Sequence, residues 1–166
     1  MLFRSTYQAH PIACAASLAV QQVIKDENLI SSCLSQGAKF GNLLRESVRS
    51  DENPAKPFVF DVRGSGCFWA VEFSFNPTEI EGDFKELSER YDLTFGRKKF
   101  GAPVQSQCMK NGMNILGFSG GGDVDGKTGD HIVFAPPYNV TDQEIYEIVM
   151  RLEKSLKEVM ETYRKS

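Results

Sequence analysis

Cysteine is the residue type in this sequence most suited to reactive or metal-binding chemistry, and its spacing limits what it can do. Cys14, Cys33, Cys67 and Cys108 are the four cysteines, and no two of them form a C-x-x-C pair. Such spacing indicates buried or half-buried thiols in a reducing compartment, and we expect a cytoplasmic protein. Neither a disulfide framework nor a metal site is predicted.

The two histidines and the glycine run offer little more. His10 stands directly before Pro11, a position typical of capping at the start of a helix. His131 opens an apolar run, and we expect a surface or supporting histidine there rather than a general base. Glycines 120–122 lack the Gly-Lys-Ser/Thr that completes a phosphate-binding loop. We therefore predict no catalytic residue and no metal ligand among these groups.

A long apolar helix is predicted over residues 11–26. Almost every residue is small or apolar, and Pro11 suits the first helical turn. A helix that is apolar nearly all round is normally buried on more than one side. Because it begins close to Met1, we expect a partner or a missing N-terminal part to bury it.

A second helix should follow Ser31 or Ser32 as its cap and end before the loop at residues 51–57, where two prolines stop it. Residues 58–63 and 67–73 are rich in aromatic and β-branched types and flank a Gly-Ser-Gly turn, which predicts a β-hairpin. The apolar positions expected on one face of each element are Leu34, Ala38, Phe40, Leu43, Leu44 and Val48 in the helix, Phe58, Phe60 and Val62 in the first strand, and Trp69, Val71 and Phe73 in the second.

The second half of the sequence predicts helices alternating with short strands. We expect a short helix over 83–91, a helix from about 103 to 110 ended by Gly112, strands over 113–116 and 131–135, and a glycine-rich loop over 117–129. Thr141 and Glu144 form a capping box at the start of a last amphipathic helix. The predicted fold is α+β, with an antiparallel sheet of about three or four strands flanked by helices.

Composition excludes several classes of protein. The chain has 166 residues, 41% of them hydrophobic and 25% charged, as is usual for a compact globular domain. A net charge of −3 gives no basic face for nucleic acid. No apolar run reaches the length of about 20 residues that a membrane span needs.

Three blocks of sequence carry a family resemblance. They are residues 6–11 (TYQAHP) running into ACAA, residues 61–73 (DVRGSGCFWAVEF) and residues 129–138 (GDHIVFAPPY). In this order they resemble the C-terminal part of class III aminotransferases, which are fold-type-I enzymes that use pyridoxal phosphate. The blocks span nearly the whole chain.

The resemblance implies both an organisation and a function. Residues 1–28 would be the segment and helix leaving a large domain, and residues 29–166 would be the small C-terminal domain. The intact enzyme would be a homodimer that moves an amino group between an amine or amino acid and a keto acid. Thr6 matches the family threonine that donates to the cofactor phosphate of the neighbouring subunit. Its own context indicates only a helix-entry residue, and Arg4-Ser5 stands where the family has Gly-His.

The resemblance also shows what this chain lacks. The family forms a Schiff base on a lysine at a strand end in a glycine-rich context, and Lys25, Lys39, Lys110, Lys154, Lys157 and Lys165 instead fall in helix patterns. We therefore expect the chain alone to be inactive. Val133 stands where ornithine-type members carry a carboxylate-binding arginine, which implies an amine or ω-amino-acid substrate or an arginine from elsewhere.

Two other readings stay open. The chain could act by itself as a non-enzymatic α+β interaction module derived from a truncated aminotransferase gene, pairing through its first helix. A ferredoxin-like domain that binds a small molecule or nucleic acid fits the order of elements but not the acidic balance.

Overall fold

The computed structural model describes residues 8–164 except 77, 81, 92–99 and 121–128. The elements in chain order are α1 (Pro11–Asp26), α2 (Leu29–Val48), a 3-10 turn (Lys56–Phe58), β1 (Val59–Ser65), β2 (Phe68–Phe73), α3 (Phe84–Tyr91), α4 (Gly101–Lys110), β3 (Leu116–Phe118), β4 (Asp130–Phe134) and α5 (Asp142–Tyr163). The α+β prediction is confirmed.

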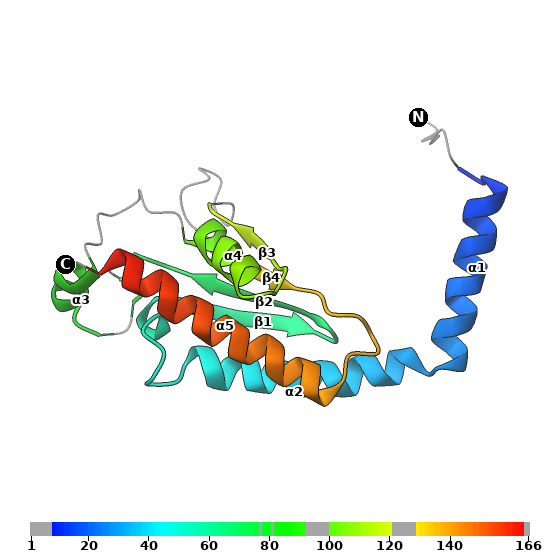
Figure 1. Cartoon of the computed structure of the whole chain (residues 1–166), viewed down its shortest axis with the longest axis horizontal. Helices are drawn as coiled ribbons and strands as arrows, with labels where there is room; N and C mark the ends of the chain where they lie inside the picture. The colour runs from blue at the N-terminus through cyan, green and yellow to red at the C-terminus, as the bar shows by residue number, and fades with distance from the viewer. Residues whose placement is uncertain (1–7, 77, 81, 92–99, 121–128, 165–166) are drawn as a thin grey trace.

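The four strands form one antiparallel sheet in the order β1-β2-β4-β3. Strands β1 and β2 are the predicted hairpin, whereas β3 and β4 pair at the other side of the sheet (Figure 1). Along β2 and β4 burial alternates, so that one face of the sheet is buried and the other is half-exposed. The predicted face of β2 is confirmed, since Trp69, Val71 and Phe73 are all buried.

Three helices form a layer on the buried face. Helix α2 packs against β1, α4 packs against β3 and β4, and α5 contacts both α2 and α4 (Figure 1). The apolar stripe of α5 fills the space between its two neighbours, because Ile145, Leu152 and Leu156 are almost completely buried. The predicted capping box at its start is confirmed: Thr141 Oγ1 accepts from Glu144 N, and Glu144 accepts from Thr141 N at 2.8 Å.

Helix α2 approaches the hairpin closely through two glycines. A Cβ atom on Gly37 would lie 2.0 Å from the Gly66 carbonyl oxygen, and one on Gly41 would lie 2.1 Å from the Trp69 ring. Trp69 is held there by its Nε1–H, which donates to the Gly66 carbonyl at 2.8 Å. The sequence pattern does not predict this role of the glycines, because only larger apolar residues indicate which face of the helix is buried.

The predicted start of the second helix is wrong by a few residues. Helix α2 begins at Leu29, and the break from α1 is confined to Glu27 and Asn28. Asn28 adopts the left-handed conformation with φ 51°, which asparagine tolerates better than most residues. The first turns of α2 also face away from the core, so Leu34 is 60% exposed.

Two strand predictions need correction. The pairing register shifts between Val59 and Asp61, so simple alternation fails and Phe60 is exposed while Val62 is buried. The strand expected at 113–116 lies later, at Leu116–Phe118, and therefore includes the start of the expected glycine-rich loop. Met113 and Ile115 are buried beside the sheet but precede the ladder.

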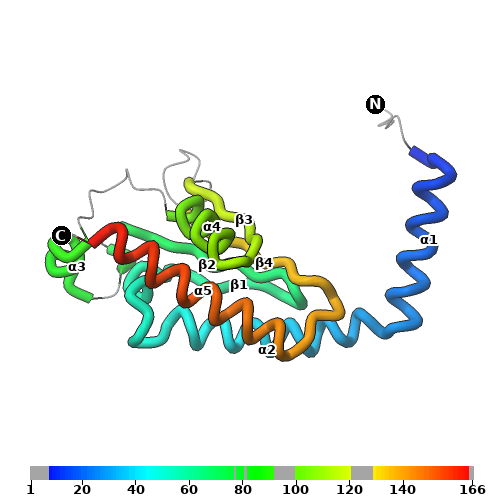
Figure 2. The backbone as a smooth tube through the Cα atoms, viewed as in Figure 1, coloured from blue at the N-terminus to red at the C-terminus, as the bar shows by residue number. Residues whose placement is uncertain are grey.

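Helix α1 has the predicted bounds, and the rest of the described chain leaves it uncovered. It projects from the end of α2 away from the other elements (Figures 1 and 2). None of its residues is buried by the described part of the chain, and Ile12 and Leu18 are 74% and 72% exposed. Covering by a partner or another segment stays a prediction. Among the described residues, no helix is long and apolar enough to cross a membrane.

Candidate functional site

The half-exposed face of the sheet, opposite the helix layer, gathers the polar side chains that could meet a ligand. Cross-strand pairing aligns Asp61, Glu72, His131 and Phe118 in one row over the four strands. The adjacent row holds Arg63, Ala70, Val133 and Leu116. We call this surface the open face.

Arg63 is the cation of the open face, and it is already paired. Its Nη1 donates to Glu72 at 2.5 Å and to Asp61 at 3.0 Å, while half of the side chain remains exposed. The hydrogen bonds that Arg63 donates to Glu72 and then to Asp61 raise the pKa of Arg63 above its ordinary value. Because two carboxylates surround one guanidinium, the cluster of Arg63, Asp61 and Glu72 has a net negative charge.

His131 lies on the open face in a fixed orientation. Its ring stacks on Phe118 with the centroids 4.8 Å apart, and its Nδ1 is 2.8 Å from the Gly129 carbonyl oxygen. Because a carbonyl only accepts, Nδ1 carries the proton in this contact. The arrangement agrees with a supporting histidine rather than a general base, since the ring is held by backbone and an aromatic neighbour.

Val133 lies in the centre of an apolar strip of the open face. It is half-buried on β4, between Ala70 of β2 and Leu116 of β3. The strip carries no charge of its own and borders the Arg63 cluster through Ala70. An apolar portion of a ligand could pack here, whereas Arg63, the cation described in this row, is already paired with carboxylates.

Asp130 organises one end of the site, a role that sequence reasoning missed. Its buried carboxylate accepts from the backbone N–H groups of Phe100, Gly101 at 3.2 Å and Gly120 at 2.6 Å. It thereby ties the start of α4 and the end of β3 to β4. The Gly129-Asp130 pair within the third resemblance block is the signal that could have indicated it.

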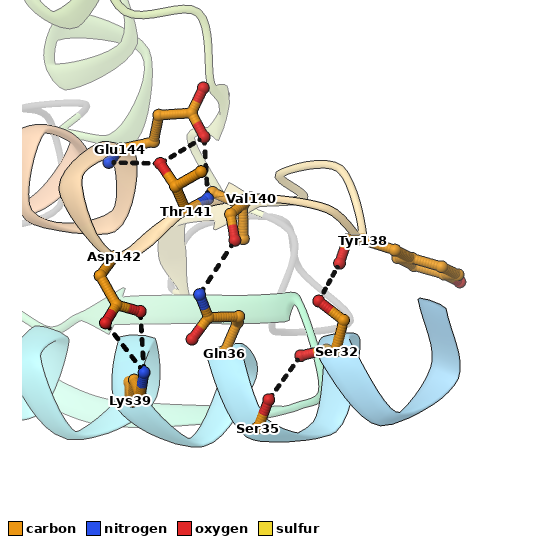
Figure 3. A network of polar contacts seen from close by, with 9 residues as sticks. All are labelled: Ser32, Ser35, Gln36, Lys39, Tyr138, Val140, Thr141, Asp142 and Glu144. Atoms are coloured by element: carbon orange, nitrogen blue, oxygen red, sulfur yellow. Dashed lines mark hydrogen bonds and ion pairs between the residues drawn. The ribbon is translucent and has the colours of Figure 1, made fainter. Parts of the chain in front are cut away.

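Hydrogen bonds and an ion pair attach residues 138–142, which follow β4, to one face of α2 (Figure 3). Ser32 Oγ donates to the Tyr138 carbonyl at 2.9 Å, and Gln36 Nε2 donates to the Val140 carbonyl at 3.1 Å. Lys39 Nζ then lies 2.8 Å from Asp142 Oδ1. The Tyr138 ring points away from this network and is 45% exposed.

The remaining predicted residues fall into three groups. His10 occupies the N-cap position of α1, as predicted, although its side chain makes no capping hydrogen bond. Cys14 is exposed, contrary to the expected burial, because α1 is uncovered; all four thiols are free. Thr6, Lys127, Lys165 and most of the glycine-rich loop lie outside the described residues.

No cation site or reactive lysine is found in the described ranges. Each lysine there lies on a helix or on the 3-10 turn, and Lys39 and Lys56 pair with Asp142 and Asp51. No three histidine, cysteine or acidic side chains come together where the structure is described.

Comparison with known proteins gives one consistent family. The model of the family "Aminotransferase class-III" matches residues 3–156. An uncharacterized aminotransferase of Schizosaccharomyces pombe is 34% identical over 91% of this chain and 29% of its own length. Gamma aminobutyrate transaminase 1, mitochondrial, of Solanum lycopersicum is 29% identical over 92% of this chain and 24% of its own length.

Solved structures agree with the sequence matches. A transaminase from a study of directed evolution by ancestral reconstruction superposes with a TM-score of 0.69 and 29% identity, covering 98% of this chain and 30% of that one. A Bacillus anthracis aminotransferase gives a TM-score of 0.67 at 24% identity over 95% of this chain and 31% of its own, which supports the fold alone. The chain thus spans about a quarter to a third of the length of these proteins.

Proposed function

This chain belongs to the class III aminotransferases, and from that premise we propose that residues 29–166 are the small domain of a pyridoxal-phosphate-dependent aminotransferase. Residues 1–28 would be the segment and helix that enter it from the large domain. The complete protein would transfer an amino group between an amine or amino acid and a keto acid. The observation that carries the proposal is the family match over residues 3–156, supported by the likeness of the whole fold to a solved transaminase.

The described residues do not themselves fit pyridoxal phosphate. When bound, the cofactor supplies an electron sink for amino transfer, but it needs a lysine for covalent attachment and donors for its phosphate. The described lysines lie along helices, and no glycine-rich strand end presents one of them. We therefore place cofactor attachment in the part of the enzyme that this chain does not span. Thr6 remains our proposed phosphate donor to the neighbouring subunit of a homodimer.

The open face is our proposal for the contribution of this chain to the substrate cleft. The apolar strip around Val133 would pack against the carbon chain of an amine or ω-amino acid. Asp61 and Glu72 both pair with Arg63, so this cluster carries a net negative charge beside the apolar strip. A substrate carboxylate placed there would lose hydration and lie beside Asp61 and Glu72, which disfavours it.

Helix α1 supports the proposed assembly. Its exposed apolar surface suits contact with a large domain or a second subunit, since single soluble domains rarely expose a large contiguous apolar patch. The same surface also suits the alternative of a stand-alone interaction module. The size and activity of the endogenous protein separate the two.

The first test is an antibody raised against residues 142–163 and used on a lysate of the source cells. We expect it to capture a product several times longer than 166 residues that transaminates and releases pyridoxal phosphate on denaturation. A product of 166 residues with no amino transfer would overturn the proposal and favour the interaction module.

The substrate class can be tested separately in the captured enzyme's recombinant form. Val133→Arg should raise kcat/KM for donors with a carboxylate at the distal end relative to uncharged amines, because the new guanidinium could pair with it. Leu116→Arg, in the same row but on the edge strand, is the matched control and should change the ratio less. An unchanged ratio in both variants would contradict the assignment of this strip to the substrate.

A further inference from the structure

Cys33 and Cys67 come together although 34 positions separate them in sequence. Cys33 lies near the start of α2, and Cys67 lies in the turn of the β1–β2 hairpin. The backbone N–H of Cys67 donates to Cys33 Sγ at 3.3 Å, and Cys67 Sγ–H donates to the Cys33 carbonyl at 3.7 Å. Each cysteine thus contacts the other through its thiol.

The surrounding backbone holds this contact in place. Gly66 precedes Cys67 with φ 53°, and a Cβ atom built on it would lie 2.9 Å from Cys33 Sγ. One turn further along α2, Gly37 lies directly against the Gly66 carbonyl. A Cβ atom on Gly37 would meet the Gly66 backbone and one on Gly66 would meet Cys33 Sγ, so both glycines let the hairpin turn lie close against α2 beside the two cysteines.

The two thiols differ in access to solvent. Cys33 is half-buried, whereas Cys67 is only 5% exposed. Burial first, and then the neighbouring Cys33 thiol, raise the pKa of Cys67 to about 11. A small reagent arriving from solvent therefore meets Cys33 first, and Cys67 is positioned to react with it second.

We propose that Cys33 and Cys67 are a redox-sensitive dithiol that a hydroperoxide converts into an intramolecular disulfide, which covalently ties the hairpin turn to α2. This inference is independent of the proposed amino transfer.

The chemistry balances with hydrogen peroxide as the oxidant. The Cys33 thiolate attacks one peroxide oxygen, the O–O bond breaks, and Cys33 becomes a sulfenic acid while the leaving hydroxide takes up a proton as water. Cys67 then loses its proton as its sulfur attacks the Cys33 sulfur, and the sulfenic oxygen leaves as a second water. Two electrons pass from the two thiols to the peroxide.

The test uses the whole chain carrying Cys14→Ser, so that the exposed thiol cannot link two molecules. After equimolar hydrogen peroxide and alkylation of the remaining thiols, a non-reducing tryptic digest is examined by mass spectrometry. We expect residues 26–39 joined to residues 64–85, with the loss of two hydrogen atoms and reversal by a reductant. We also expect the melting temperature to rise by several degrees, since the bond closes a long loop.

Two variants that remove the Cys67 thiol test whether Cys33 reacts first. Cys67→Ser should stop the reaction at a Cys33 sulfenic acid that a sulfenic-acid trap captures; Cys67→Ala serves the same purpose if serine is not tolerated at this buried site. The chain with only Cys14→Ser is the matched control. Recovery of both thiols alkylated, or of Cys33 trapped as sulfenic acid while Cys67 is intact in that control, would overturn the proposal.

Discussion

Helices α1 and α2 follow each other in the chain, yet they have opposite relations to the core. Helix α1 is the more apolar of the two, but the described chain buries none of its residues. Helix α2 carries more polar residues and still buries Phe40, Leu44 and Val48 almost completely. Apolar content therefore indicates that a helix should be buried, whereas the elements packed beside it determine whether this chain buries it.

The two helices also differ in how small residues are used. In α1 all four alanines are exposed in the described chain. In α2, Gly37 and Gly41 let the hairpin approach to contact distance, and Arg45 stacks over the Trp69 ring 4.6 Å from its centroid. Close approach with a matched partner is what turns α2 into part of the core.

The largest expected effect contrasts one leucine from each helix. Leu44→Ala should lower the free energy of unfolding by about 2–5 kcal/mol, because Leu44 is fully buried and the change leaves a cavity. Leu18→Ala in α1 should stay within about 0.5 kcal/mol, since Leu18 is 72% exposed. Urea denaturation measures both. Equal losses would mean that α1 is buried in solution, and the comparison would fail.

A glycine substitution in α2 sharpens the comparison further. Gly37→Ala should destabilise the chain by about 1–3 kcal/mol although alanine favours helix, because the new methyl group would meet the Gly66 backbone. Ala38→Ser, at the exposed adjacent position, is the control and should change the urea midpoint little. A stabilised Gly37→Ala chain would show that the hairpin does not press against α2.

The stability that α5 gives by packing against α2 should depend on its N-terminal cap and on pH. Thr141→Ala should cost about 1 kcal/mol through loss of the capping box. Hydrogen bonds from Thr141 lower the pKa of Glu144 below 4.5, so its stabilising contribution is full above pH 4.5 and is lost as pH falls through the lower, folded-state pKa. Thermal unfolding of wild type and Glu144→Gln from pH 7 to 3 should therefore converge at the acid end. Curves that stay parallel would argue against the cap.

The smallest effect is expected at the exposed ion pair between the two helices. Lys39→Gln removes the partner of Asp142, whose pKa the Lys39 hydrogen bond lowers, yet both side chains are largely exposed. We expect only a slight, salt-sensitive change in melting temperature. A large change would mean that this pair, rather than the buried face of α2, holds the helices together.

Most elements followed from local sequence patterns. The bounds of α1, the hairpin, the short α3, the end of α4 before Gly112 and the capping box of α5 were all predicted correctly. The errors came where neighbours override local preference. Phe60 is exposed because the pairing register shifts beside it, and β3 starts only where β4 is available to pair.

The candidate site was less predictable than the fold. Val133 was singled out from the resemblance, but its row with Ala70 and Leu116 depends on strand order. The roles of Arg63 and Asp130 were missed, because their partners lie on other strands or at a helix start. Thr6 lies outside the described residues and remains a prediction.

Three motif blocks in the sequence were enough to indicate the family. Local patterns gave the α+β class and the boundaries of most helices, because periodicity, caps and turn residues act over a few neighbouring positions. The order of the strands, with β4 between β2 and β3, became known from the folded chain alone. The same holds for the close packing of the hairpin against Gly37 and Gly41 of α2 and for the contact between Cys33 and Cys67. These contacts join residues far apart in the chain, and no local pattern encodes which distant surface will be present to meet them.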